Sequence, residues 1–373
     1  MIKVETVQSP QELKLFVRFP WQLYKGDPCW VPPIFEEELK FFDPQQNPVF
    51  EHSIAHFLLA YDEQNQLVGR AVAIINDLDE SVLNIKKIRF GWFDFIDDLE
   101  VSQALLDKIK AIGQEHHRTY MEGPMGFSNL DKVGVLTSGF DSIGTMASWH
   151  NHPYYQKHYE ANGLTVEKEY VECRFPFSNI DITKAKKVSK IVRHRFGYAI
   201  VNPRRRKEVF AYADDMFRLF NESYAKLSSY LPITDNEIGY IKKKFLGFIA
   251  ADFIKFVLDK DKNMIAFAIV MPQFAHALIK SKGKLLPFGF LRILWAKKFS
   301  KTAVFYLIGV SEAHQNKGAT ALLFESYHED FSKRGMTTCI RTPELATNTA
   351  IRQLWKDFSP EVYKTRATYS KVI

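Results

Sequence analysis

The sequence is poor in cysteine, and its cysteines show none of the spacing that metal sites or disulfide frameworks use. Cys29, Cys173 and Cys339 are odd in number and far apart in the chain. Structural zinc sites need cysteine or histidine pairs a few residues apart, and disulfide scaffolds need paired cysteines. We therefore expect no metal and no disulfide, and a reducing cytoplasm is the setting that this sequence predicts.

Long apolar runs are also absent. Residues 1–7 lack the apolar core of a secretory signal peptide. No uncharged apolar run approaches the ~20 residues that a helix needs to span a membrane. The sequence therefore predicts a soluble protein without a transmembrane segment.

Acidic residues are fewer than basic ones, since 43 Asp and Glu against 50 Lys and Arg give a net charge of +7. This excess favours phosphorylated ligands, acidic lipids or RNA, and is equally typical of an ordinary basic soluble protein. Apolar residues are plentiful: 46% are hydrophobic and 14% aromatic, with 31 Phe among 373 residues. This composition and length predict two folded domains with large cores and exclude a disordered chain.

The chain contains the same order of predicted elements twice. Each half opens with a strand, an amphipathic helix and a β-hairpin with a polar turn. In the first half these elements cover residues 2–7, 10 onward, 56–61 and 67–75. In the second half they cover residues 198–202, 207–224, 253–258 and 264–270.

The later elements repeat as well. A helix and a strand are predicted at 99–117 and 120–124, and again at 321–333 and 336–342. A short helix then follows Asn151 in the first half and Asn348 in the second, and each half closes with a strand-like segment, 169–176 and 361–372. The repeat predicts two α/β units, residues 1–177 and 197–373, joined by a polar, basic linker at 178–196.

A hexamer in the second half has the features of an anion site. It follows an apolar strand, 303–310, and precedes an amphipathic helix, 321–334. A helix start leaves backbone N–H groups unpaired and carries the positive end of the helix dipole. A glycine in such a turn lets an anion approach the backbone closely. The hexamer consists of Gln315, Asn316, Lys317, Gly318, Ala319 and Thr320.

The hexamer resembles the pyrophosphate loop of the GNAT acyltransferases, in which Gln or Arg stands first, Gly fourth and Gly or Ala sixth; here Thr320 stands sixth. Residues 348–358 resemble the last-helix signature of that superfamily, and the order β-α-β-β-β-α-β-α-β resembles its domain. The motif Gly-Asp-Pro-Cys-Trp-Val-Pro-Pro at 26–33 is similar to an uncharacterised bacterial GNAT-like type. The resemblance implies two GNAT-like domains, each with a mixed, mostly antiparallel sheet flanked by helices.

The resemblance also implies a site for acetyl-CoA or another acyl-CoA in the second half. The pantetheine arm would pair with the strand ending at Val310, and the pyrophosphate would lie at residues 315–320. Asn348 and Trp355 of the last helix would complete the cofactor site. The first half has Asp97, Asp98 and Glu100 at the corresponding helix start, where carboxylates cap a helix and repel a pyrophosphate. We therefore expect the first half to be a degenerate copy that shapes the substrate groove.

Catalytic residues are harder to assign. Many GNAT enzymes have a tyrosine acid seven residues after the asparagine, where this chain has Trp355, whose indole is a poor acid. The candidate catalytic groups are Glu312, just after the central strand, and Tyr306 within it, with His314 nearby. Each has an ordinary structural reading as well: a solvated carboxylate, a core ring and a surface imidazole.

Two insertions are long enough to have a role of their own. The loop 126–149 is expected to be a lid or to line the acceptor site, or else to be an ordered surface insertion. The segment 272–301 has seven basic residues, no acidic residue and interleaved apolar side chains. Such a segment can contact an anionic membrane or tRNA peripherally. The commoner arrangement, which we expect here, buries the apolar face on its own domain.

These features together predict an acyl-CoA-dependent N-acyltransferase that moves an acetyl or other acyl group to a small-molecule or peptide amine. One alternative is an aminoacyl-tRNA-dependent peptidyltransferase like the Fem enzymes, which are also tandem GNAT folds, although the chain has no dedicated RNA-binding module. A second alternative is a non-catalytic binding protein that keeps the fold. No DNA partner is expected.

Overall fold

A computed structural model describes residues 1–227, 229–244 and 249–373. In the first half the strands are β1 (Lys3–Thr6), β2 (Ser53–Tyr61), β3 (Leu67–Asn76), β4 (Lys87–Phe95), β5 (Tyr120–Gly123), β6 (Val135–Ser138) and β7 (Thr165–Pro176). The α-helices of this half are α1 (Pro10–Leu23), α2 (Phe35–Phe41), α3 (Asp77–Ser81), α4 (Leu99–Glu115) and α5 (Tyr155–Ala161).

The second half repeats this order. Its strands are β8 (Ala199–Val201), β9 (Ile254–Leu258), β10 (Met264–Pro272), β11 (Thr302–Val310), β12 (Thr338–Arg341), β13 (Glu344–Leu345) and β14 (Glu361–Val372). Its α-helices are α6 (Ile182–Phe196), α7 (Arg206–Ala211), α8 (Ala213–Tyr224), α9 (Asp235–Lys244), α10 (Ala275–Ser281), α11 (Gly289–Phe299), α12 (Ala319–Arg334) and α13 (Thr349–Trp355). The predicted mixed α/β architecture with two similar halves is confirmed.

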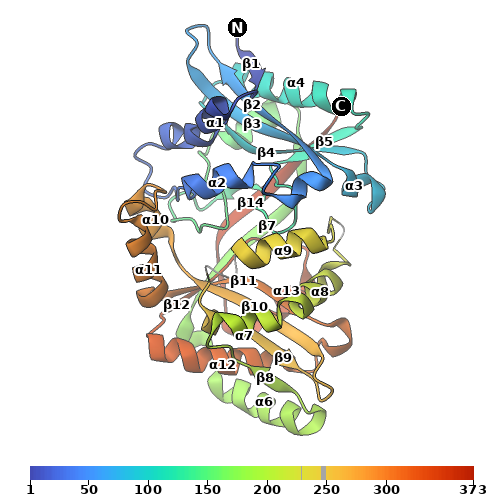
Figure 1. The fold of residues 1–373 in the computed structure, drawn as a ribbon, viewed down its shortest axis with the longest axis vertical. Helices are drawn as coiled ribbons and strands as arrows, with labels where there is room; N and C mark the ends of the chain where they lie inside the picture. Colours follow the sequence, from blue (N-terminus) through green and yellow to red (C-terminus); the bar gives the residue numbers. More distant parts are fainter. Residues whose placement is uncertain (228, 245–248) are drawn as a thin grey trace.

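One sheet runs through both halves in the order β1-β2-β3-β4-β5-β14-β7-β12-β11-β10-β9-β8. Among the strands of the described residues, only the pairs β4·β5 and β11·β12 are parallel. The last strand of the chain, β14, lies between β5 and β7, while β7 of the first half continues to β12. The halves therefore exchange their last strands, and Figure 1 shows both strands crossing the middle of the molecule, with the C-terminus beside the first half.

A buried ion pair joins the two exchanged strands. Arg366 on β14 donates from Nε to Glu172 on β7 at 2.5 Å, and both side chains are 0% exposed. Lys364, two residues before Arg366, lies opposite Glu172 and is also buried. The contacts place two cations and one carboxylate at the centre of the molecule.

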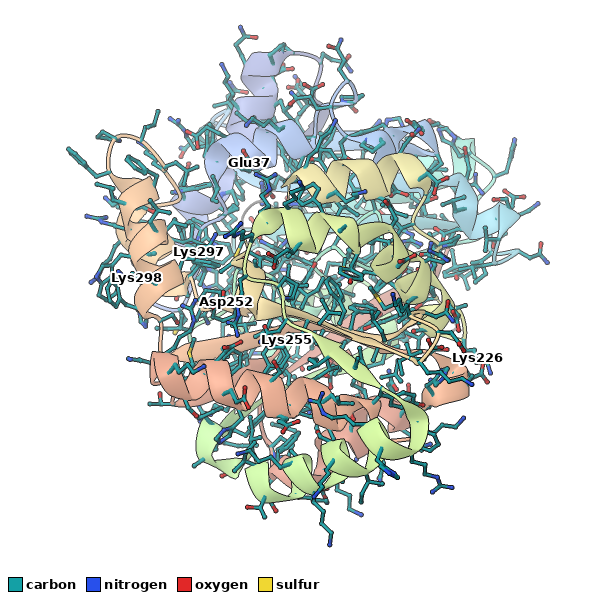
Figure 2. All side chains as sticks on the ribbon, turned by 60° about the horizontal axis from the view of Figure 1, so that its bottom comes forward. Glu37, Lys226, Asp252, Lys255, Lys297 and Lys298 are labelled. Carbon is teal, nitrogen blue, oxygen red and sulfur yellow. The ribbon has the colours of Figure 1, made fainter. Side chains whose placement is uncertain are left out.

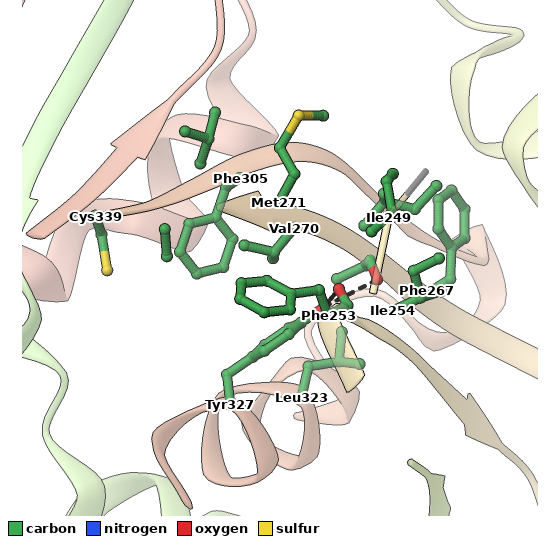
Figure 3. Packing of buried hydrophobic residues seen from close by; sticks show 14 of the residues in the cluster. Ile249, Phe253, Ile254, Phe267, Val270, Met271, Phe305, Leu323, Tyr327 and Cys339 are labelled. Carbon is green, nitrogen blue, oxygen red and sulfur yellow. Dashed lines mark hydrogen bonds between the residues drawn. The ribbon is translucent and has the colours of Figure 1, made fainter. Parts of the chain in front are cut away.

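Helices cover both faces of the sheet. In the first half, α4 and α5 pack on one face and α1 and α2 on the other, each over its own apolar cluster. In the second half, α12 packs on β8–β10 and is held there by Tyr327, whose hydroxyl donates to the carbonyls of Phe253 and Ala268, both at 2.9 Å (Figure 3). This anchor fixes where the N-terminus of α12 lies.

The predicted linker, residues 178–196, forms a helix over most of its length. Asp181 caps the start of α6 by accepting from the Lys184 N–H at 3.0 Å, and Gly197 ends it in a left-handed conformation with φ of 68°. Val188 and Val192 on one face of α6 lie against the start of α12. The basic residues of this stretch therefore lie on the solvent face of a packed helix.

Candidate active site

The central strand of the second half, β11, has a β-bulge at the point where its parallel partner ends. Leu307 pairs with Ile269 of β10, but Phe305 pairs with Val270, so Tyr306 is the extra residue. On the other side, β12 pairs with β11 only from Thr302 to Phe305. Residues 306–310 thus extend beyond β12.

The backbone of this extension faces away from β10 at alternate residues. The Ser311 N–H donates to the Ile265 carbonyl, so Ser311 points its backbone groups toward β10. Because this orientation alternates along a strand, Ile308 and Val310 point their N–H and C=O groups to the edge away from β10. Two hydroxyls from the end of α8 reach these carbonyls: Tyr224 donates to Ile308 at 3.1 Å and Ser223 to Val310 at 3.3 Å. The N–H groups on the same edge are the donors that an extended ligand would use.

The hexamer 315–320 forms the entry to α12, as predicted. Gly318 is the N-cap of this helix with φ of 81°, and Asn316 also has a positive φ of 59°. Gln315, Asn316 and Lys317 are exposed, whereas Ala319 is buried. A Cβ on Gly318 would lie 2.9 Å from Val188 and 3.0 Å from Val192. The glycine is therefore required for its left-handed conformation and for the close approach of α6.

Trp355 and Asn348 have different surroundings. Trp355 is buried against Phe305 and Phe324, with the Arg341 guanidinium 5.1 Å from its ring centre. Its indole N–H has no hydrogen-bond acceptor among the described residues. Asn348 caps α13, because its side chain accepts from the Ile351 N–H at 3.2 Å. The indole N–H of Trp355 is thus an unpaired buried donor beside Phe305, the last residue of β11 that pairs with β12. A ligand between the two strands could accept a hydrogen bond from it.

The two candidate catalytic residues lie in different environments. Glu312 is exposed and forms an ion pair with Lys226 at the end of α8. Tyr306 donates its hydroxyl to the Leu130 carbonyl at 2.8 Å, and burial raises the pKa of this hydroxyl. A tyrosine in this state does not act as a base near neutral pH, so its ring and its fixed hydroxyl mainly shape the site.

A pocket lies beside the bulge, between the two halves. It is lined by Tyr306 and Leu307 of β11, by α8 and α9, and by loop 126–149 and α2 of the first half. Most of its lining residues are apolar: Phe41, Val49, Leu130, Phe217, Ile241, Ile249, Ile269 and Leu307. Leu130 and Asp131 of loop 126–149 form part of this lining, and the role of the loop at an acceptor site stays a prediction.

Two carboxylates also line the pocket. Burial raises the pKa of Asp131 to about 6, although the Ser128 N–H donates to it at 2.9 Å and the Lys244 charge opposes the shift. Burial alone would also raise the pKa of Glu237, but a hydrogen bond from His52 and one from the Thr234 N–H keep it low. Asp131 is therefore the lining group that changes charge closest to neutral pH.

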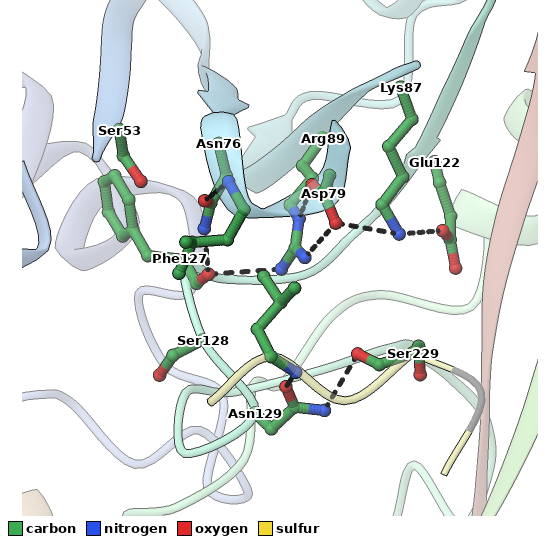
Figure 4. A network of polar contacts seen from close by, with 12 residues as sticks. Ser53, Asn76, Asp79, Lys87, Arg89, Glu122, Phe127, Ser128, Asn129 and Ser229 are labelled. Carbon is green, nitrogen blue, oxygen red and sulfur yellow. Dashed lines mark hydrogen bonds and ion pairs between the residues drawn. The ribbon is translucent and has the colours of Figure 1, made fainter. Parts of the chain in front are cut away.

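A polar network in the first half holds the loop that carries Asp131 (Figure 4). Arg89 pairs with Asp79 at 2.6 Å and donates to the Phe127 carbonyl at 3.2 Å, which also accepts from Asn76 at 3.1 Å. Asn129 extends the network into the second half, donating to the Ser229 carbonyl and accepting from the Leu231 N–H. The buried charges of the first half thus fix the wall of the pocket.

The corresponding region of the first half is closed by its own chain. The Met125 N–H donates to the Phe90 carbonyl of β4 at 2.8 Å. Gly91 has no room for a side chain, because a Cβ there would lie 2.3 Å from the Met125 carbonyl oxygen. At the start of α4, the Asp98 side chain accepts from the Glu100 N–H at 2.9 Å. Protein groups therefore occupy the edge of β4 and the start of α4, and the absence of a cofactor site in the first half stays a prediction.

His150 has a structural partner, and the described residues offer neither a metal site nor a membrane-spanning helix. His150 donates from Nε2 to the Asp27 carboxylate at 2.9 Å. Burial would raise the pKa of Asp27, but this imidazole keeps it at about 2. In residues 1–227, 229–244 and 249–373, no group of three or more His, Cys, Asp or Glu is placed to hold a metal ion. No helix in these ranges is both long and apolar enough to cross a bilayer.

The doubled order of elements, the bulged central strand and the glycine-capped helix define the class: the chain has a tandem GNAT fold. A tandem GNAT protein from the clavulanic acid biosynthesis pathway superposes over 100% of this chain and 98% of its own, with a TM-score of 0.57 and 9% identity. A GCN5-related N-acetyltransferase from Sphaerobacter thermophilus does so over 100% and 95%, with a TM-score of 0.54 and 9% identity.

Two curated proteins are similar over nearly their whole length. Protein YghO of Escherichia coli (strain K12) is 27% identical over 378 residues, which cover 99% of this chain and 95% of that protein. A protein named Bacterial ceramide synthase, from Caulobacter vibrioides, is 24% identical over 382 residues, which cover 100% and 98%. No sequence-family profile matches the chain.

Proposed function

We propose that this protein is an N-acyltransferase that moves an acyl group from coenzyme A to a long-chain amine. The observation that carries the proposal is the apolar pocket at the β11 bulge, which places a titratable carboxylate, Asp131, beside the strand along which GNAT folds hold their donor. The similarity to a protein named Bacterial ceramide synthase supports it, because a ceramide is an N-acylated long-chain amino alcohol. The comparisons favour this reading over the tRNA-dependent alternative.

In the proposed reaction, the neutral amine attacks the thioester carbonyl. A C–N bond replaces the C–S bond, and one proton passes from nitrogen toward the departing thiolate. Asp131 is ionised above about pH 6 and accepts the proton of the attacking amine. The Trp355 N–H and the outward N–H groups of β11 orient the donor, which supplies rate through position alone.

The cofactor loop is tested by reversing the charge of Lys317, an exposed residue at the N-terminus of α12. We expect Lys317→Glu to weaken CoA binding roughly 3- to 30-fold, since each charge at a helix start is worth ~0.3–1 kcal/mol and the change is two charges. Calorimetric titration with CoA measures the effect.

Lys333→Glu is the matched control, because it makes the same charge change in the last turn of α12. Equal losses in the two variants, or none in either, would show that CoA does not bind at the start of α12. Gly318 is a poor choice for this test, since any side chain there meets Val188 and Val192 of α6.

The apolar pocket is tested with Ile241→Trp, which places a larger, aromatic side chain in its α9 wall. We expect binding of a long-chain amine, and acyl transfer to it, to fall about tenfold or more, while binding of CoA itself is unchanged, because overfilling a packed site costs ~1–3 kcal/mol. Calorimetry with CoA and with the long-chain amine measures the two effects separately. Ile191→Trp on the exposed face of α6 is the control, and a variant that binds long chains normally would argue against this pocket as their site.

A further inference from the structure

Among the described residues, the α10–α11 hairpin presents the largest group of exposed apolar side chains close together in the sequence. Within residues 286–299, seven large apolar side chains are exposed: Leu286, Phe288, Phe290, Leu291, Leu294, Trp295 and Phe299. All the exposed Phe and Trp side chains of the described chain lie in this segment. The expected burial of the insertion on its own domain is therefore incomplete.

Helix α11 is apolar on two sides. Gly289, Ile293 and Ala296 form a buried stripe at helical spacing, and this stripe accounts for its packing on the protein. The outward side carries Leu294 and Trp295, which are 55% and 64% exposed. A helix that is apolar all round normally lies in a core or in lipid, and monomeric proteins rarely leave so large an apolar patch in water.

Basic residues surround this apolar side. Lys280, Lys282, Lys284, Arg292, Lys298 and Lys301 are exposed in the segment 272–301, which has no acidic residue. Figure 2 shows the hairpin at the edge of the molecule, with Lys297 and Lys298 labelled near the end of α11. Long basic side chains that flank apolar ones place their charges at lipid headgroups while the apolar groups enter the acyl region.

We propose that the hairpin formed by α10 and α11 docks the protein on the surface of an anionic lipid bilayer. Only a bilayer offers both an apolar phase for the seven exposed side chains and negative charge for the basic ones. A second copy of the same surface would bring two uniformly positive patches together, which repel. RNA would satisfy the lysines and leave the exposed Leu, Phe and Trp in water.

The hairpin is fixed to the rest of the protein at its turn. The Phe35 N–H donates to the Gly283 carbonyl at 3.1 Å, and the Trp21 indole donates to the Lys282 carbonyl at 2.9 Å. Phe35 begins α2, and Phe41 at the other end of that helix lines the pocket. Helix α2 therefore connects the turn of the docking hairpin to the apolar pocket. This connection matters for the reaction only if the proposed function holds, whereas membrane docking does not depend on the proposed function.

Vesicle flotation of the full chain tests the proposal without any substrate. The protein is mixed with vesicles of phosphatidylcholine, or of phosphatidylcholine and phosphatidylglycerol, at low and high salt. We expect binding to the anionic vesicles that weakens with salt, and much weaker binding to the neutral ones. The double variant Lys284→Gln with Lys298→Gln should bind anionic vesicles about 30-fold more weakly. Leu294→Ser with Trp295→Ser should lose about tenfold or more.

Matched controls lie on α6, which is also basic and exposed. Lys187→Gln with Lys190→Gln, and Ile191→Ser, should bind like the unchanged protein. All the variants change exposed residues, and their unfolding temperatures should be measured to check that they fold. Failure of the unchanged protein to float, or equal losses in the α6 and hairpin variants, would overturn the proposal. The proposal would also fail if light scattering showed a dimer that the Leu294→Ser with Trp295→Ser variant loses while it still binds vesicles. It would fail as well if the protein did not bind vesicles but bound tRNA through the hairpin lysines.

Discussion

Replacing Glu172 with alanine is expected to lower the free energy of unfolding by about 3–5 kcal/mol, the range found when one partner of a buried ion pair is removed. Glu172 and Arg366 are both 0% exposed, and Glu172 also accepts a hydrogen bond from the Tyr363 hydroxyl at 3.3 Å. Without this carboxylate, Arg366 and Lys364 remain as two buried cations. Urea unfolding followed by tryptophan fluorescence measures the loss.

The Glu172→Ala substitution should also change how the stability of the fold depends on pH. Burial lowers the pKa of Lys364 from 10.5 to about 8, while attraction to Glu172 works in the opposite direction. A lysine whose pKa is lower in the folded state destabilises the fold while protonated, so stability rises as the pH rises from about 8 toward 10.5. Loss of Glu172 removes the opposing attraction and lowers the pKa of Lys364 further, so we expect this rise with pH to begin at a lower pH and to be larger in total in Glu172→Ala.

The control uses another carboxylate–arginine pair across the same two strands. Glu361 on β14 faces Arg174 on β7 at 3.1 Å, but both side chains are exposed. Glu361→Ala should change stability little, because solvent screens such pairs. Because β7 and β14 belong to the sheets of both halves, Glu172→Ala should destabilise the halves together in one transition. Separate transitions, or similar effects of the two substitutions, would contradict the exchanged-strand account.

The element order of this chain is predictable from the sequence because its signals are local. Asp98 and Asn348 precede amphipathic helices and cap them, and alternating apolar residues mark the hairpins. The strand exchange has no such signal. Segments 169–176 and 361–372 are both strand-like, and nothing local determines which half each will pair with.

The candidate site is predictable only in part, for a related reason. Gly318 and its helix are visible in the sequence, but the valines of α6 that require the glycine lie in a stretch interpreted as a linker. Asp131 belongs to no sequence motif, and only the length of its loop, 126–149, indicates a functional role for this region. Its raised pKa depends on burial by residues from α2, α9 and β11, which are distant in sequence. Tyr306 does reach the pocket, while Glu312 stays at the surface with Lys226.

Replacing Asp131 with asparagine is expected to lower kcat for acyl transfer by about 10²-fold or more, the usual effect of losing a general base. Asparagine keeps an oxygen that accepts from the Ser128 N–H, so the loop retains its main contact. Under the proposed function, the unchanged protein should gain activity as the pH rises through about 6, where Asp131 becomes ionised, and the variant should lack this rise. Rates measured against pH with a long-chain amine and acyl-CoA test both points.

Stability separates this catalytic role from a structural one. The pKa of Asp131 is raised in the folded state, from 3.8 to about 6, so its ionised form destabilises the fold above that pH. Asp131→Asn removes that charge and should be at least as stable as the unchanged protein at neutral pH. Asp141→Asn, at an exposed position of the same loop, should leave rate and pH profile unchanged. A variant at Asp131 that keeps the rise near pH 6, or loses activity only in proportion to lost folded protein, would assign the proton transfer to another group.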